Sequence, residues 1–162
     1  MSRSLLCETV TGGTMAELVA ARDAATDPDL VELRLDGVRG LDVAQALHGR
    51  HRPAIVTCRP VWEGGRFDGD EEARRRVLLQ ALELGAEYVD VEWRSLQGPR
   101  GSGGFDGLLH ADARRIVVSS HDFADMPGDL RGQARAMRST GAAVIKVAVT
   151  PARLSDTLAL RD

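Results

Sequence analysis

Short apolar segments alternate along the chain with segments whose apolar residues recur at helical spacing. Runs that are rich in β-branched residues and bounded by turn residues predict buried strands. These runs cover residues 5–10, 29–36, 53–59, 87–93, 115–121 and 142–150. The segments that follow them predict helices over residues 14–25, 41–47, 70–84, 105–110, 129–140 and 151–162. The pattern therefore predicts six consecutive β-α units.

Segment 70–84 gives the strongest helix signal in the chain. Asp70 can cap its first turn, acidic residues follow the cap, and Gly85 can end the helix. The residues predicted to share its apolar face are Ala73, Val77, Ala81 and Leu84.

Alternating strands and helices predict a parallel sheet with right-handed crossovers. An open doubly wound sheet usually carries a glycine fingerprint after its first strand, and residues 11–14 (TGGT) lack it. The glycine-rich stretch 98–104 is predicted to be a flexible loop, because it has no phosphate-binding lysine. The remaining arrangement is a (β/α)8 barrel, which needs eight units in about 250 residues. We therefore predict an α/β fold of the TIM-barrel type, with only about six β-α units present.

Residues 1–162 are predicted to form a single, incomplete (β/α) barrel domain. The chain ends on Leu160, Arg161 and Asp162, with no glycine cap after the last predicted helix. We therefore expect a fragment, or a protein truncated at its C-terminus. Six strands cannot close such a barrel, so two strand edges would stay open to association.

The alternation of side chains along each strand places polar groups of five strands on one face. In a barrel this face points inward, and barrel interiors are normally filled with branched apolar residues. Such an interior predicts a polar site, or alternatively a satisfied ion-pair network around a water-filled axis. The residues concerned are Glu32, Arg34, Asp36, Arg59, Asp90, Glu92, His121 and Lys146.

Lys146 is the only lysine among 21 lysine and arginine residues, and it lies in the apolar run VIKVAV. Its head could reach water past a buried stem. Alternatively, neighbouring cations could favour its neutral amine, which attacks ketones to form a Schiff base. His121 could then move a proton, and arginines on the same face could hold a carboxylate or hydroxyls. These residues indicate a Schiff-base lyase or aldolase that acts on an anionic keto compound.

The composition argues against several other classes of protein. The net charge of −3 favours neither nucleic acid nor an anionic membrane as a partner. Cys7 and Cys58 form no disulfide framework, and the sequence has neither an apolar stretch near 18 residues nor a signal-peptide pattern. We therefore expect a cytoplasmic protein. No Cys/His ligand spacing for zinc occurs, and the interleaved arginines argue against a divalent cation among the carboxylates. No metal and no cofactor are expected.

Several short motifs together cover nearly the whole chain. They are residues 32–36 (ELRLD), 57–59 (TCR), 63–65 (EGG), 88–92 (YVDVE), 119–123 (SSHDF) and 146–149 (KVAV). In order and spacing, this set resembles the type I 3-dehydroquinate dehydratases of the shikimate pathway. The resemblance implies the conversion of 3-dehydroquinate to 3-dehydroshikimate and water, within aromatic amino-acid biosynthesis.

The resemblance also implies a role for each residue of the site. Lys146 would form an imine with the C3 ketone of the substrate. His121 would remove the C2 proton and then protonate the departing C1 hydroxyl. Glu63 would orient or assist His121. The ring hydroxyls would be held by Glu32, Arg34 and Arg59.

Other functions remain open from the sequence. The chain could be another class I Schiff-base barrel of the aldolase type, a non-catalytic fragment that binds a shikimate-pathway ligand, or one domain of a multifunctional enzyme. Family members continue through two more β-α units, which supply an arginine and a lid loop to the site. We therefore expect weak or no dehydratase activity from this chain by itself. A homodimer is compatible with the resemblance, because family members are often dimeric.

Overall fold

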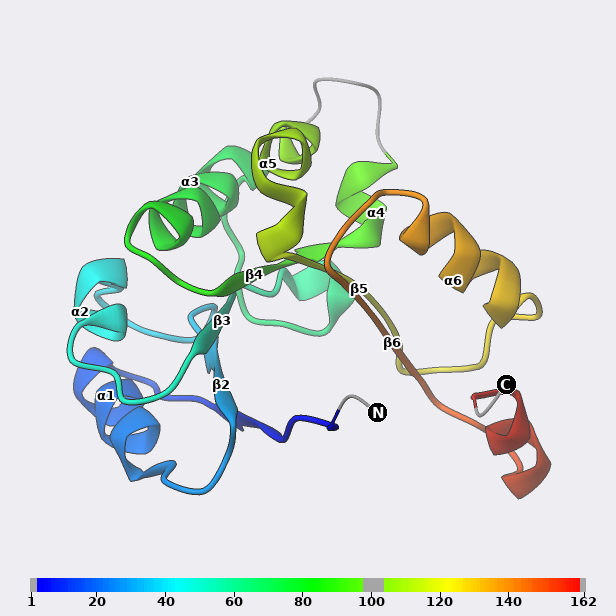
Figure 1. Ribbon diagram of the computed structural model, residues 1–162, viewed down its shortest axis with the longest axis horizontal. Coiled ribbons are helices and arrows are strands. Elements are labelled where there is room, and N and C mark those ends of the chain that lie inside the picture. Colours follow the sequence, from blue (N-terminus) through cyan, green and yellow to red (C-terminus); the bar gives the residue numbers. More distant parts are fainter. Residues whose placement is uncertain (1–2, 98–103, 161–162) are drawn as a thin grey trace. The chain divides into compact units, whose positions relative to one another are not determined.

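The computed structural model describes residues 3–97 and 104–160 (Figure 1), so most of the predicted loop 98–104 lies outside the described residues. The chain divides into two compact units, Met1–Asp90 (unit 1) and Val91–Asp162 (unit 2). We describe each unit separately.

Unit 1 is built from β-α repeats whose strands pair in parallel and in chain order, β1 to β4. Figure 1 shows α1, α2 and α3 on one side of these strands. The elements are β1 (Cys7–Val10), α1 (Met15–Ala24), β2 (Leu30–Arg34), α2 (Val43–Leu47), β3 (Ala54–Thr57), the 3₁₀ helix η1 (Val61–Glu63), α3 (Glu71–Glu83) and β4 (Tyr88–Glu92), whose last two residues belong to unit 2.

Local sequence signals explain where the helices of unit 1 begin. Thr14 and Glu17 form a capping box at the start of α1. The Asp42 and Asp70 side chains accept backbone hydrogen bonds at the starts of α2 and α3. Beneath the helices lies an apolar core that includes Leu18, Val31, Leu33, Val56, Leu78 and Val89.

The predicted buried face of α3 is wrong. Ala81 is buried as expected, but Leu84 is 42% exposed, and Ala73 and Val77 are only half-buried. The buried positions are instead Arg74, Leu78, Ala81 and Leu82. Periodicity missed this face because Arg74 supplies part of it, and a paired arginine can be buried where a lone charge could not.

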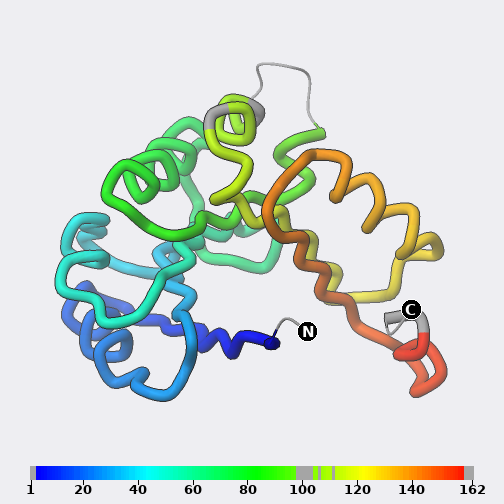
Figure 2. Tube along the Cα trace, in the orientation of Figure 1, coloured from blue at the N-terminus to red at the C-terminus, as the bar shows by residue number. Residues whose placement is uncertain are grey.

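Unit 2 contains two parallel strands, β5 (Ile116–Asp122) and β6 (Val144–Val149), which run side by side (Figure 2). Its core includes Phe105, Leu108, Ile116, Val118 and Met137. Its helical elements are α4 (Trp93–Leu96), α5 (Phe105–Asp112), η2 (Ala113–Arg115), α6 (Leu130–Arg138) and η3 (Leu154–Leu160).

The helix predicted over residues 151–162 is only partly correct. The structure places a 3₁₀ helix over Leu154–Leu160, and residues 161–162 lie outside the described part of the chain. Leu154 is 88% exposed and Leu158 is 62% exposed. Because packing of an apolar face supplies most helical stability in proteins, these exposed leucines explain why no longer α-helix forms.

Six parallel strands that alternate with helices confirm the predicted fold class, the (β/α)8 barrel type with six β-α units present. The strand order in unit 1 follows the chain, whereas a doubly wound sheet reverses its order at a switch point. Within the described residues, no helix is both long and apolar enough to span a membrane.

Candidate active site

In unit 1, Glu32 lies on β2 with its carboxylate held between two neighbouring strands. The Thr9 hydroxyl of β1 donates to Glu32 Oε2 at 3.0 Å, and the Thr57 hydroxyl of β3 donates to Oε1 at 2.7 Å. Glu32 is only 6% exposed. Both carboxylate oxygens therefore have a fixed direction before any ligand arrives, and each oxygen can accept more than one hydrogen bond.

Arg59 follows β3 and forms a buried ion pair. Its NH2 group donates to Asp90 Oδ2 of β4 at 2.9 Å, and both side chains are almost fully buried. A buried guanidinium needs such a partner, because an unpaired charge in the interior is costly. Asp90 therefore fixes Arg59 at the carboxyl end of β3.

Arg34 ends β2 and binds Asp36 through two hydrogen bonds. Its Nε and NH2 groups donate to the two oxygens of Asp36 at 2.8 and 2.9 Å. Burial alone would raise the pKa of Asp36, but the hydrogen bonds and charge of Arg34 outweigh it, so the pKa lies below its ordinary value. In return, the hydrogen bond to Asp36 raises the pKa of Arg34. Both groups are therefore charged near neutral pH.

Glu63 lies in a tight turn that packs against the backbone of Arg59. It ends the 3₁₀ helix η1, and Gly64 follows in the left-handed region with φ of 76°. A Cβ at Gly65 would lie 2.0 Å from the carbonyl oxygen of Arg59, so only glycine fits there. These two glycines let the turn fold back onto Arg59, and Glu63 within the turn is 8% exposed.

In unit 2, His121 and Lys146 lie on adjacent parallel strands. Lys146 of β6 pairs in register with Ser119 of β5, and His121 lies two residues further along β5. Because residues two apart on a strand share a face, the three side chains lie on one face of the pair. His121 stacks on Phe123 with ring centroids 6.0 Å apart. A primary amine and an imidazole are thus neighbours on this face.

Comparison with known proteins places this arrangement in a family. Residues 6–162 match the family described as Type I 3-dehydroquinase. The chain belongs to the type I 3-dehydroquinase family.

Two relatives of this 3-dehydroquinase chain have names that agree with the family. It is 34% identical to the chloroplastic bifunctional 3-dehydroquinate dehydratase/shikimate dehydrogenase of Arabidopsis thaliana, over 94% of this chain and 26% of that protein. It is also 34% identical to a 3-dehydroquinate dehydratase of Methanothrix thermoacetophila, over 91% of this chain and 62% of that protein. The chain thus spans less than two thirds of the length of each.

A solved structure supports the fold independently. A crystal structure of a type I 3-dehydroquinate dehydratase from Clostridium difficile aligns with a TM-score of 0.81 and 21% identity. The alignment covers 99% of this chain and 68% of that chain. At this identity, the likeness concerns the fold alone.

The predicted site residues of this 3-dehydroquinase chain fall into two sets. Unit 1 brings together the predicted substrate-binding residues and Glu63, and unit 2 places His121 beside Lys146. Sequence reasoning placed Asp36 on the polar face but gave it no individual role, and it gave no site role to Thr9 or Thr57; all three contact predicted residues. For Thr57 and Asp36 a signal exists, because each lies two residues from a predicted arginine.

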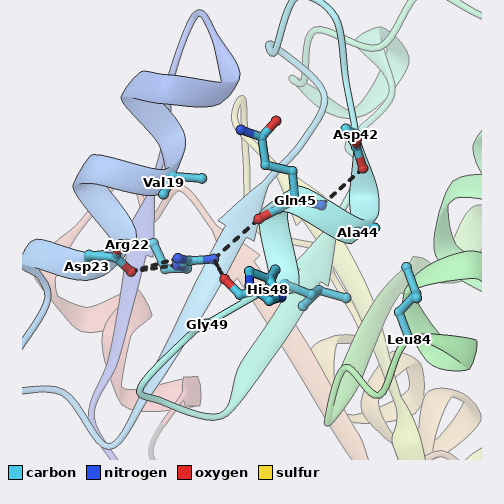
Figure 3. A pocket seen from close by; sticks show the side chains of 10 residues that line it. Val19, Arg22, Asp23, Asp42, Ala44, Gln45, His48, Gly49 and Leu84 are labelled. Carbon is cyan, nitrogen blue, oxygen red and sulfur yellow. Dashed lines mark hydrogen bonds and ion pairs between the residues drawn. The ribbon is translucent and has the colours of Figure 1, made fainter.

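A pocket of about 920 Å³ in unit 1 lies elsewhere, between α1, α2 and Leu84 (Figure 3). None of the six predicted site residues lines it. The buried Arg22 reaches from α1 into the end of α2, where NH1 donates to the carbonyls of Ala46 at 2.6 Å and His48 at 2.9 Å. Arg22 therefore satisfies backbone groups at a helix end.

In residues 3–97 and 104–160, no three histidine, cysteine or acidic side chains form a group that could hold a metal ion.

Proposed function

We propose that the site of this chain serves the dehydration of 3-dehydroquinate to 3-dehydroshikimate, with weak activity when residues 1–162 act alone. The observation that carries the proposal is the placement of the only lysine, Lys146, beside His121 on adjacent strands of a type I 3-dehydroquinase chain.

The chemistry begins at Lys146. Its neutral amine attacks the C3 ketone, and loss of water gives an iminium ion that withdraws electrons from C2. His121 then removes the C2 proton, leaving an enamine. The enamine electrons expel the C1 hydroxyl, which leaves as water after taking a proton from His121. Hydrolysis of the resulting iminium returns the lysine and releases 3-dehydroshikimate, so the net change is loss of one water.

Unit 1 supplies the groups that hold the substrate. Arg34 and Arg59 are charged donors suited to hydroxyl and carboxylate oxygens, and Glu32 is an acceptor for a ring hydroxyl. Asp36 holds Arg34, and Asp90 holds Arg59. Thr9 and Thr57 together hold Glu32. Preorganised groups of this kind cost little to order when a ligand binds. The family resemblance gives Glu63 the role of orienting or assisting His121.

The proposal also covers the domain organisation, cellular location and partners of the chain. Residues 1–162 act as one incomplete barrel domain, the protein is cytoplasmic, and a homodimer is compatible with it. The substrate is a small molecule, and neither nucleic acid nor a membrane is a partner.

A substrate panel tests the reaction. 3-Dehydroshikimate contains a conjugated enone that 3-dehydroquinate lacks, so its formation raises near-ultraviolet absorbance. We expect an increase with 3-dehydroquinate that the Lys146→Ala variant does not give. Turnover of aldol substrates instead would indicate an aldolase, and binding of 3-dehydroquinate without an absorbance change would indicate a non-catalytic binding protein. Either result would overturn the proposed dehydration.

A further inference from the structure

We propose that Asp36 is a positioning residue that holds two parts of the site in place: Arg34, a proposed substrate-binding residue, and the turn that carries Glu63. This inference rests on the proposed function and deepens it. Asp36 belongs to the ELRLD motif, but the mechanism above gives it no step.

The first contact of Asp36 fixes a guanidinium. Arg34 donates from Nε and NH2 to the two Asp36 oxygens, which is the planar two-point geometry that a carboxylate and a guanidinium share. Two parallel hydrogen bonds define the plane of the group as well as its position. The Asp36 side chain is 2% exposed, so water does not compete strongly for these bonds. The NH1 nitrogen of Arg34 lies outside this two-point contact.

The second contact of Asp36 reaches the backbone of another loop. The Arg66 backbone N–H donates to Asp36 Oδ2 at 3.0 Å, so one oxygen serves both Arg34 and the loop after β3. Arg66 lies three residues after Glu63 in sequence. Asp36 therefore connects the end of β2 to the turn that carries Glu63.

That turn behaves as one piece because its own backbone closes it. The Phe67 N–H donates to the Arg59 carbonyl at 3.0 Å, and the Gly65 and Glu63 N–H groups donate to the Pro60 carbonyl at 2.9 and 3.1 Å. A segment closed in this way moves as a unit, so holding Arg66 also holds Glu63. The opposite side of the turn is tied to α3, where the Arg74 guanidinium lies 5.9 Å from the centre of the Trp62 ring.

Asparagine cannot replace Asp36 in this role. An amide has one acceptor oxygen and one donor nitrogen, so the nitrogen would face an N–H group of Arg34 or Arg66. Asp36→Asn therefore keeps the shape of the side chain but breaks at least one of its contacts.

Glu87 offers a matched control in the same unit. Its carboxylate also bridges an arginine and a backbone N–H, accepting from Arg50 NH2 at 3.0 Å and from the Ala54 N–H at 2.6 Å. Ala54 begins β3, so this bridge lies at the other end of the strand from Arg59. Glu87→Gln removes the same charge from a carboxylate that also joins an arginine to a backbone N–H, without touching a proposed site residue. The Glu87 side chain is 39% exposed, against 2% for Asp36.

The test compares Asp36→Asn and Glu87→Gln by NMR titration with 3-dehydroquinate in the Lys146→Ala background, where no imine can form on a lysine. We expect Asp36→Asn to weaken binding about tenfold, the effect of losing one charge-assisted hydrogen bond. It should also lose hydrogen-exchange protection at the Arg66 amide and the Arg34 Nε–H. Glu87→Gln should change none of these three readouts.

Unchanged binding by Asp36→Asn, or an equal loss in Glu87→Gln, would overturn the positioning role. Retained protection at Arg34 and Arg66 would overturn it as well. If the protein with only Lys146→Ala binds no 3-dehydroquinate, the inference and the substrate assignment both fail. If it binds but the wild-type protein forms no imine, only the proposed chemistry fails.

Discussion

The two units carry their proposed site residues in different surroundings. In unit 1, Glu32, Arg59 and Glu63 are each less than a tenth exposed, and Glu32 and Arg59 have partners on adjacent strands. In unit 2, His121 and Lys146 are half-buried on a pair of strands. The proposed site residues of unit 1 are therefore fixed in advance, whereas the proposed reacting groups of unit 2 remain partly accessible. Mutations in the two units should accordingly fail in different ways.

Removing the imidazole in unit 2 should have the largest effect on the rate. We expect His121→Ala to lower the rate of 3-dehydroshikimate formation by about 10²–10⁴-fold, the usual contribution of a general acid–base group. Imine formation needs Lys146 rather than C2 proton removal, so a borohydride-trapped adduct should still form. Absorbance and mass spectrometry measure the two steps separately. If His121→Ala forms product at the wild-type rate, the assignment of His121 is wrong.

Breaking the buried ion pair of unit 1 should mainly affect stability. Arg59→Met leaves the carboxylate of Asp90 buried without this partner, and such losses typically cost about 3–5 kcal/mol in the free energy of unfolding. The double variant Arg59→Met/Asp90→Leu should recover most of that loss, because a buried ion pair and apolar packing are often similar in stability. Urea unfolding measures both variants. A double variant as unstable as the single one would contradict this account of the pair.

A smaller effect should follow from removing one hydroxyl that holds Glu32. Thr57→Val keeps the shape of the side chain but removes its 2.7 Å hydrogen bond to the carboxylate, so we expect a loss of about 1.5–3 kcal/mol. Thr57→Ser keeps the hydroxyl and loses one methyl group, which should cost only about 1 kcal/mol. Denaturant midpoints compare the two variants, and a serine variant less stable than the valine variant would exclude the hydroxyl as the main contribution.

The smallest effect should be the pH dependence due to Asp36. Its pKa is lower in the folded state than its ordinary value, so the folded protein is stabilised at pH values above about 4. That stabilisation is lost as the pH falls through the folded-state pKa. The charges of Arg34, Arg59 and Glu32 and the Arg66 N–H surround this ion pair. In Asp36→Asn, the free energy of unfolding should therefore change less steeply with pH below about pH 4, as measured by urea unfolding at several pH values. An unchanged pH dependence would contradict the lowered pKa of Asp36.

Much of the fold could be predicted because its signals are local. Alternating apolar runs located all six strands, and the predicted cap Asp70 begins α3. The predicted helices 14–25 and 129–140 also start at the residues that cap them, Thr14 and Asp129. The buried face of α3 could not be predicted from periodicity, since part of it is Arg74, which pairs with Glu71 and contacts Trp62. That contact depends on a turn distant from the helix pattern.

The site was predictable only as far as side-chain direction along a strand allows. Alternation placed Glu32 and Arg34 on one face, and the register shows Thr57 beside them. The link from Asp36 to the Arg66 N–H could not be found in this way, because it depends on backbone hydrogen bonds that close residues 59–67. Hydrogen bonds of loop backbone groups leave no periodic trace in a sequence.

The central claim is tested most directly by locating the adduct that borohydride traps with 3-dehydroquinate. Because the chain has a single lysine, only Lys146 and the N-terminal amine can form an imine through a primary amine. The account predicts one adduct per chain, mapped by peptide mass spectrometry to Lys146 and absent from Lys146→Ala. An adduct only at the N-terminus, or no adduct in the wild-type protein, would contradict it.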